Sequence, residues 1–271
     1  MKISDKSMKL IYIINGIFIL AMIIIWFIPS LIFSEAMEFE ANIFQSILII
    51  MTAAIDTICL WYLANRYKLP TTLGKMWFLL GLGMLGWFIG EIIYTYYENF
   101  TEIDPFPSIA DLFYLLAYIP LSIGLILQMR LLKITLPKRD KFIVFISFLI
   151  ICIIVIVSVI ILPIQEVSPI PEDEIFAYFV AALYPILDLF LMLCIFVVFA
   201  KLYHGEINTA WLFLLLGFLL TVFADIIFNW VEVVGVEPVT FELYDLLYLI
   251  GYILIYIGAF KVINIMTKTF E

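Results

Sequence analysis

Histidine is almost absent from this sequence, because His204 is the only one among 271 residues. Zinc hydrolysis sites and bis-histidine haem sites both depend on imidazole ligands, so both are excluded. The apolar segments contain no lysine that could form a Schiff base, which excludes a retinal protein. The sequence also lacks a nucleophile elbow, a phosphate-binding loop and a redox cysteine pair. We therefore expect no haem, retinal or zinc cofactor.

Charged residues are scarce as well, at 14% of the chain against 66% hydrophobic residues, which is more apolar material than one soluble core can bury. An apolar run of about 20 residues spans the roughly 30 Å of bilayer hydrocarbon. Runs of this kind occur at Leu10–Ile28, Ile43–Ala64, Met76–Tyr97, Ile109–Met129, Phe142–Leu162, Ile175–Ala200, Ala210–Val231 and Leu243–Phe260. The sequence thus predicts an all-α, polytopic membrane protein with eight transmembrane helices in a lipid bilayer.

Basic residues are missing from every second gap between these runs. All 14 Lys and Arg lie before the first run or after the second, fourth, sixth and eighth runs. In the other gaps, every charged residue is an Asp or a Glu. Lysine and arginine are retained on the cytoplasmic side of membranes. We therefore expect a cell-membrane protein with both termini in the cytoplasm and a first helix that is retained, not cleaved. The net charge of −9 describes an acidic outer face and argues against nucleic acid as a partner.

The chain resembles itself when it is shifted by 134 residues. The shift aligns, without a gap, Trp77 with Trp211, Gly83 with Gly217, Glu98 with Glu232, Asp111 with Asp245, Tyr114 with Tyr248, Tyr118 with Tyr252 and Gly124 with Gly258. We interpret this as two four-helix repeats, residues 1–136 and 137–271, joined by a short cytoplasmic connector at 137–141. Since each copy has an even number of helices, the repeats are expected to be parallel in the membrane.

Six acids lie inside the apolar runs, where a carboxylate costs several kcal/mol unless a proton, a cation or hydrogen-bond donors stabilise it. The repeat pairs Glu91 with Asp225, Asp111 with Asp245 and, after a two-residue insertion, Asp56 with Asp188. No basic residue lies at their depth. Counted from the helix ends, Glu91 and Asp111 should meet near the outer boundary, as should Asp225 and Asp245, with Asp56 and Asp188 nearer the middle.

Tyrosines accompany these acids at helical spacing. Tyr114 and Tyr118 follow Asp111 at i+3 and i+7, Tyr248 and Tyr252 follow Asp245 in the same way, and Tyr94 stands three residues after Glu91. A tyrosine can donate a hydrogen bond to a carboxylate and offer a cation its ring. We therefore predict an acidic cavity that opens outward, formed by Glu91, Asp111, Asp225, Asp245, Tyr94, Tyr114, Tyr118, Tyr248 and Tyr252, with Asp56 and Asp188 deepest.

Several of these residues also have purely structural interpretations. Ser108-Ile-Ala-Asp111 fits a capping box, in which Asp111 only closes the start of a helix. Tyr94, Trp87 and Trp230 are compatible with aromatic residues at the membrane interface. Gly86-x-x-x-Gly90 is typical of close helix packing.

The stretch Gly90-Glu91-Ile-Ile-Tyr94 to Glu98, followed by Pro105-Phe-Pro-Ser-Ile-Ala-Asp-Leu-Phe-Tyr-Leu-Leu-Ala-Tyr118, resembles the multi-helix membrane sensor regions of prokaryotes. Those regions usually precede histidine kinase or diguanylate cyclase domains. The resemblance is best over Trp77–Gly124 and weaker over Trp211–Gly258. It implies signal reception in the membrane. Because the sequence ends at Glu271 without an output domain, we expect signal transduction through a separate protein on the cytoplasmic side.

Three classes of function remain open from the sequence. The first is a membrane sensor or ligand-binding module whose cavity takes a cation, an amine or a proton. The second is a cation- or proton-coupled transporter or ion pathway, since paired acids and a two-fold repeat also serve translocation. The third is a membrane enzyme that uses a divalent cation held by carboxylates, which is the one metal cofactor that the residue types allow.

Overall fold

The computed structural model describes Ile13, Ile14, Gly16, Ile17 and Leu20, and then residues 35–133, 135–161, 174–203, 209–234 and 243–269. From residue 35 onward, the described residues form seven α-helices and no β-strand. This confirms the all-α fold class.

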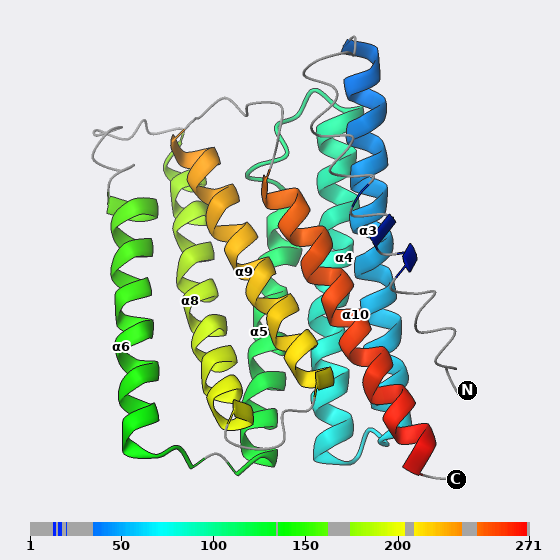
Figure 1. Cartoon of the computed structure of the whole chain (residues 1–271). Helices are drawn as coiled ribbons and strands as arrows, with labels where there is room; N and C mark the ends of the chain where they lie inside the picture. The colour runs from blue at the N-terminus through cyan, green and yellow to red at the C-terminus, as the bar shows by residue number, and fades with distance from the viewer. Residues whose placement is uncertain are drawn as a thin grey trace.

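Six of the helices are long and apolar enough to cross a membrane. They are α3 (Glu35–Arg66), α4 (Thr72–Phe100), α5 (Ile109–Leu131), α8 (Ile175–Tyr203), α9 (Thr209–Val234) and α10 (Leu243–Thr269). In one bundle, α3, α5, α8 and α10 run downward and α4 and α9 run upward (Figure 1). The chain is therefore a multi-pass membrane protein.

The remaining two predicted spans have different outcomes. The predicted helix at residues 10–28 lies largely outside the described residues. The predicted span at 142–162 corresponds to α6 (Lys138–Val155) and the π-helical segment η1 (Ile156–Ile161), at one edge of the bundle (Figure 1). Helix α6 is not among the six apolar helices, because its first turn carries Lys138, Arg139, Asp140 and Lys141. The predicted connector at 137–141 is helical from Lys138 onward, and Pro137 is the N-cap of that helix.

The helices also extend beyond the apolar runs that predicted them. Helix α3 begins at Glu35, eight residues before the predicted start, and α4 continues through Glu98 to Phe100. Glutamate is a good helix former, and acidic side chains near a helix N-terminus interact favourably with its dipole. Hydropathy alone therefore places these helix ends too early or too late.

The described basic residues gather at one end of the bundle. Arg66, Arg130 and Lys201 lie in the last turns of α3, α5 and α8, and Lys75 lies in the first turn of α4. These turns form the lower end of the bundle in Figure 1. The opposite end, called the acidic end below, carries Glu98 in the last turn of α4 and Glu102 and Asp104 in the α4–α5 connection.

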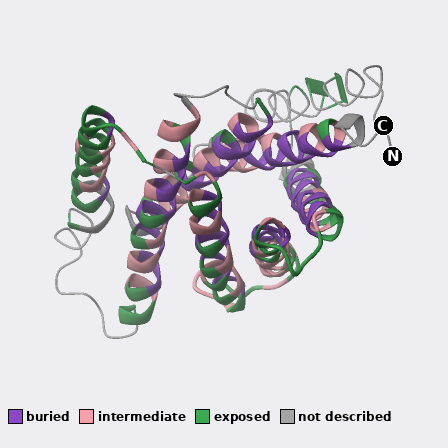
Figure 2. Cartoon of the chain, turned by 90° about the horizontal axis from the view of Figure 1, so that it is seen from below, coloured by how far each residue is buried: buried purple, intermediate pink, exposed green. Residues whose placement is uncertain are grey.

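The six long helices pack as two trios, α3-α4-α5 and α8-α9-α10. Within the trios, α4 packs extensively on α5 and α9 on α10, while α3 packs on α10 and α5 on α8 to join the trios. Buried side chains face the middle of the bundle, whereas α6 is exposed over most of its surface (Figure 2). In a bilayer, lipid is the solvent for those outward faces.

Glycines let the helices inside each trio approach closely. A Cβ on Gly83 of α4 would lie 2.3 Å from Leu121 Cγ of α5, and a Cβ on Gly217 of α9 would lie 2.6 Å from Ile255 Cγ1 of α10. Both members of the second contact follow those of the first by the same interval along the chain. Where the trios meet, the rings of Trp77 and Trp211 stack with centroids 5.2 Å apart.

We expect Gly83→Val to destabilise the protein, because the new side chain collides with Leu121. Overpacking of this kind costs about 1–3 kcal/mol. The matched control is Leu82→Val, which places the same residue at a neighbouring, exposed position. Thermal unfolding of the purified protein in detergent measures the effect. Equal melting temperatures for the two variants would contradict the close α4–α5 contact.

Candidate functional site

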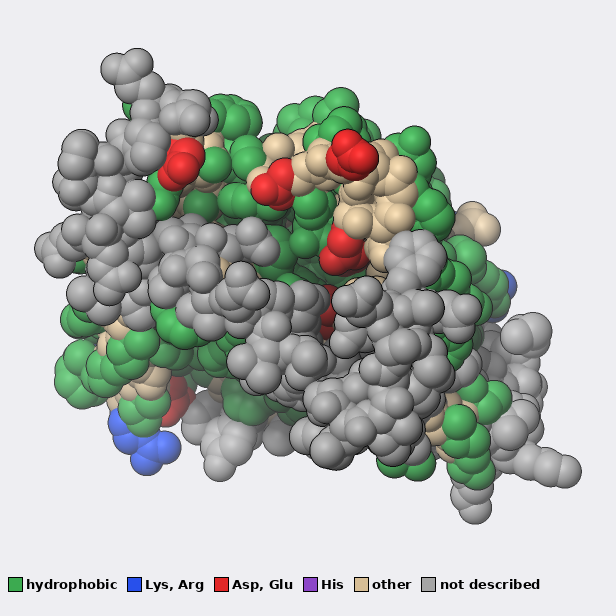
Figure 3. Space-filling model, turned by 90° about the horizontal axis from the view of Figure 1, so that it is seen from above, with side chains coloured by type: hydrophobic (Ala, Val, Ile, Leu, Met, Phe, Trp, Pro, Cys, Tyr) green, Lys and Arg blue, Asp and Glu red, His purple; other side chains and the backbone are tan. Residues whose placement is uncertain are grey.

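A pocket lies between all six long helices near the acidic end of the bundle. Together with the open space at its mouth, it has a volume of about 850 Å³. Seen from above, acidic side chains surround a hollow in this face (Figure 3). The 18 lining residues include five carboxylic acids and no Lys, Arg or His. The pocket thus has the charge of a cation-binding site.

The structure brings most of the sequence-predicted site residues into this one pocket. Those that line it are Glu91, Asp111, Asp225, Asp245, Tyr94, Tyr114, Tyr248 and Tyr252. The other three, Tyr118, Asp188 and Asp56, are not among the lining residues. Tyr118 and Asp188 are linked to the pocket through Asp225, because the Tyr118 hydroxyl contacts both carboxyl groups. Asp56 neither lines the pocket nor forms a side-chain hydrogen bond with a residue that does.

Glu91 and Asp225 accept hydrogen bonds from tyrosines of the opposite trio. The Tyr252 hydroxyl of α10 donates to Glu91 Oε1 of α4 over 3.1 Å. The Tyr118 hydroxyl of α5 lies 2.8 Å from Asp225 Oδ2 of α9. The two contacts are reciprocal, since each trio supplies one acid and one hydroxyl. A second tyrosine, Tyr248, donates to Asp225 Oδ1 over 2.5 Å.

Tyr118 links the pocket to a deeper carboxyl group. Its hydroxyl oxygen lies 2.5 Å from Asp188 Oδ1 as well as 2.8 Å from Asp225 Oδ2. A hydroxyl carries one proton and can donate to only one acceptor. Both contacts are hydrogen bonds only when one of the two carboxyl groups carries a proton and donates it to the tyrosine. The second oxygen of Asp188 is buried without a hydrogen-bond partner.

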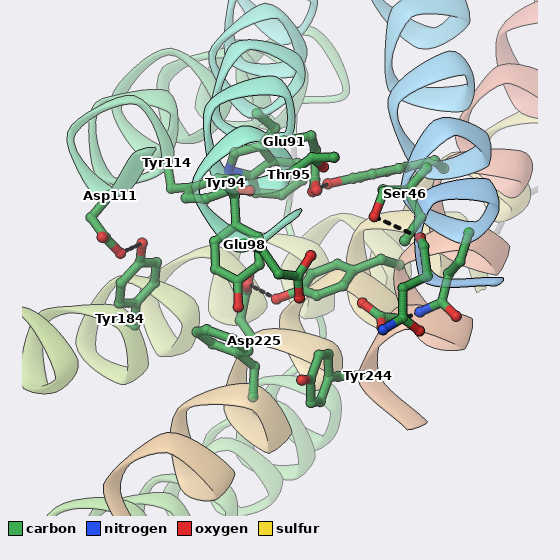
Figure 4. Close-up of a pocket in the computed structure, with 18 residues that line it drawn as sticks. Ser46, Glu91, Tyr94, Thr95, Glu98, Asp111, Tyr114, Tyr184, Asp225 and Tyr244 are labelled. Atoms are coloured by element: carbon green, nitrogen blue, oxygen red, sulfur yellow. Dashed lines mark hydrogen bonds between the residues drawn. The ribbon is translucent and has the colours of Figure 1, made fainter. Parts of the chain in front are cut away.

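The two acids nearest the helix starts are held by structural hydrogen bonds. Asp111 Oδ2 accepts from the Ser108 backbone N–H over 2.6 Å, which completes the predicted capping box of α5. Its Oδ1 accepts from the Tyr184 hydroxyl of α8 over 2.6 Å (Figure 4). Asp245, in the first turn of α10, accepts from the Gln45 amide of α3. Both acids thus tie the trios together and also line the pocket.

Asp56 lies apart from the pocket, in the interior of the bundle. It is completely buried on α3, and no other side chain bonds to either of its oxygens. Asp56 and Asp188, which the repeat pairs, are therefore alike in burial but differ in hydrogen bonding, because only Asp188 has a tyrosine partner. A buried carboxyl group of this kind still requires a proton or a donor.

The carboxyl groups do not converge on a single point. Among the residues that the structure describes, no group of three or more His, Cys, Asp or Glu side chains is placed to hold a metal ion. The hydrogen-bond donors named above come from several helices, which holds the acids in different parts of the pocket wall.

Sequence reasoning missed part of the pocket wall, including Gln45, Tyr184, Phe228 and Tyr244. Gln45 could have been found, because it shares one face of α3 with Thr52 and Asp56, at i, i+7 and i+11, and all three are buried. Tyr184 precedes Asp188 by four residues, which places both on one face of α8. No comparable signal identifies Phe228, because phenylalanine is common throughout the chain.

The three aromatic residues that the sequence places at the membrane interface have different surroundings in the structure. The interfacial interpretation of Trp87 is wrong, because its side chain is only 3% exposed and packs edge-on against Tyr118 and Phe218. Tyr94 faces the pocket and packs against Phe228 (Figure 4). Trp230 is 41% exposed, as expected at an interface.

Gly90 sets the position of one pocket tyrosine. A Cβ at Gly90 would lie 2.6 Å from Tyr114 Cε1, and a Cβ at Gly86 would lie 2.8 Å from the Ala117 methyl group. Both glycines of the Gly86-x-x-x-Gly90 motif therefore pack α4 closely against α5, as the sequence predicts. The Tyr114 ring lies next to Glu91 as a result.

We expect Tyr118→Phe to destabilise the protein, because it removes the hydroxyl that two buried carboxyl groups share. An unsatisfied buried polar group costs about 1–3 kcal/mol. The matched control is Tyr96→Phe, since Tyr96 is 56% exposed and its ring contacts with Tyr97 and Phe100 survive the change. Thermal unfolding compares the two variants. If Tyr118→Phe were as stable as the control, the shared hydrogen bond would be absent.

Comparison of the chain with protein-family models, curated proteins and solved structures finds no match.

Proposed function

We propose that the protein is a membrane sensor or ligand-binding module whose pocket takes up a cation, an amine or a proton at the acidic face. The observation that carries this proposal is the lining of the pocket, which gathers five carboxylic acids from four helices and no basic side chain. Net negative charge in a low-dielectric cleft concentrates cations. A separate signalling protein on the cytoplasmic side would relay the binding event.

The distribution of charge supports an outward-facing pocket. The basic residues named above lie at the end of the bundle opposite the pocket. Because basic residues are retained on the cytoplasmic side, the acidic end would face outward in a cell membrane, with both termini in the cytoplasm. The ligand would then come from outside the cell.

An internal repeat accounts for the way the pocket is built. Contacts that recur at the same interval along the chain support it, among them Gly83 on Leu121 and Gly217 on Ile255. So does the reciprocal bonding of Tyr118 to Asp225 and of Tyr252 to Glu91. In this proposal the helices belong to two parallel four-helix repeats, residues 1–136 and 137–271, and the pocket lies on the seam between them.

A second candidate is a cation- or proton-coupled transporter. It is favoured by Tyr118, which connects Asp225 in the pocket wall to the deeper Asp188. Chains of intramembrane acids and hydroxyls serve as proton relays. Pro185 lies inside α8 three residues before Asp188, and a proline removes one backbone hydrogen bond from the helix there.

We expect cations or acidic pH to raise the melting temperature of the purified protein, and Glu91→Gln combined with Asp225→Asn to abolish that response. The reason is linkage, since a ligand that binds only the folded state stabilises it. These two acids are chosen because Asp111 and Asp245 also hold helices in place. Thermal unfolding across salts and pH measures the response.

The matched control is Glu102→Gln, which removes an exposed acid from the α4–α5 connection at the same end of the bundle. This variant should respond like the natural protein. A response that persists unchanged in the double variant would show that the pocket acids do not bind the ligand.

Uptake into liposomes separates the two candidates. A sensor should give no more uptake of a labelled cation than protein-free vesicles, whereas a transporter should exceed them. Uptake that also disappears in the Glu91→Gln/Asp225→Asn variant would favour the transporter and count against a pure sensor.

A further inference from the structure

The pocket wall is as aromatic as it is acidic. Eight of its 18 lining residues carry an aromatic ring, and six of those eight are tyrosines. Rings attract cations through the negative charge on their faces, and the attraction grows when the site excludes water. A wall that combines rings and carboxylates suits a positively charged organic molecule better than a small inorganic ion.

The arrangement of the acids argues against a divalent metal ion. Such an ion takes six to eight oxygen ligands at about 2.0–2.6 Å, so an all-protein site for it needs carboxylate and carbonyl oxygens that converge on one point. Here the acids are divided among helices, with Asp111 bonded to Tyr184 and Asp245 to Gln45. No three acids among the described residues are placed around one point.

Two acids are placed to meet the charged end of a ligand. Glu91 and Asp225 enter the pocket from α4 and α9, and the stacked rings of Tyr248 and Tyr252, with centroids 6.3 Å apart, reach both of them through their hydroxyls. Both acids are only partly buried. Each therefore keeps access to the pocket while a tyrosine orients it.

A cluster of rings stands beside these acids. Phe228 is its centre, because Tyr244 packs edge-on against it at 5.3 Å and Tyr94 at 6.0 Å between ring centroids. All three side chains line the pocket, and Phe228 is itself only partly buried. Phe228 follows Asp225 by three residues on α9, which places the ring and the carboxyl group on the same helix face.

We propose that the ligand is an organic ammonium ion, whose nitrogen lies between Glu91 and Asp225 and whose apolar part lies against Phe228, Tyr94 and Tyr244. This inference rests on the proposed function, which it narrows from cations in general to one chemical class. It predicts a preference for amines that carry an aromatic or aliphatic group over metal ions and over neutral molecules of the same shape.

The test is thermal unfolding of the full chain in lipid nanodiscs with four probes: benzyltrimethylammonium, benzyl alcohol, sodium chloride and magnesium chloride. The ammonium probe should raise the melting temperature with saturation. Benzyl alcohol, which matches the ring without the charge, should have no saturable effect, and the two salts should have little. The Glu91→Gln/Asp225→Asn variant should lose the response to the ammonium probe.

Variants of Phe228 test the role of the ring. Phe228→Leu keeps an apolar side chain but removes the ring face, and we expect it to weaken binding of the ammonium probe about tenfold. Phe228→Tyr should retain affinity. The matched control is Phe223→Leu on the same helix, where the natural side chain is 39% exposed on the outer surface, and it should bind as the natural protein does.

The outcomes separate the two proposals. Stabilisation by magnesium or sodium through Glu91 and Asp225, without any response to the ammonium probe, would overturn the organic ligand but leave the cation pocket. A response to none of the probes and to no change of pH would overturn both. Equal binding to Phe228→Leu and to the natural protein would overturn the aromatic part of the site.

Discussion

The structure depends on satisfying carboxyl groups inside an apolar bundle, where the described lining of their pocket contains no Lys, Arg or His. Within the described residues, tyrosine hydroxyls, an amide and helix N–H groups do this work, and most of the side-chain donors come from the other trio of helices. The polar contacts that cross the seam thus serve two purposes. They stabilise acids that would otherwise be costly in hydrocarbon, and they fix how the two trios meet.

The same contacts shape the pocket. Because the donors come from several helices, the carboxyl groups of the described residues stand around a cavity and do not gather into a metal-binding cluster. The rings that bring the hydroxyls to the acids also form the wall. An acidic, aromatic cavity is therefore a by-product of the way the helices are joined, and a positively charged organic molecule fits it chemically.

The sequence was sufficient to predict the helical class, six of the eight expected spanning helices that the structure shows, and eight residues that line the pocket. Scarce residue types made this possible, because an acid such as Glu91 or a repeated pair such as Asp111 and Asp245 stands out in an apolar chain. Hydropathy could not show that α6 begins at Lys138, because a charged first turn is still helical. Periodicity along one helix also could not show that Asp111 pairs with Tyr184 or Asp245 with Gln45. Those partners depend on how separate helices pack.

Gly90 illustrates how far the control of a cavity can lie from its surface. The Tyr114 ring occupies the space that the Cβ of any larger residue at position 90 would fill. The ring can hold this position only because glycine has a hydrogen atom there. An alanine there would place a methyl group within 2.6 Å of the ring, so the ring would have to shift. The position of one wall of the pocket thus depends on Gly90, a residue that does not itself line the pocket.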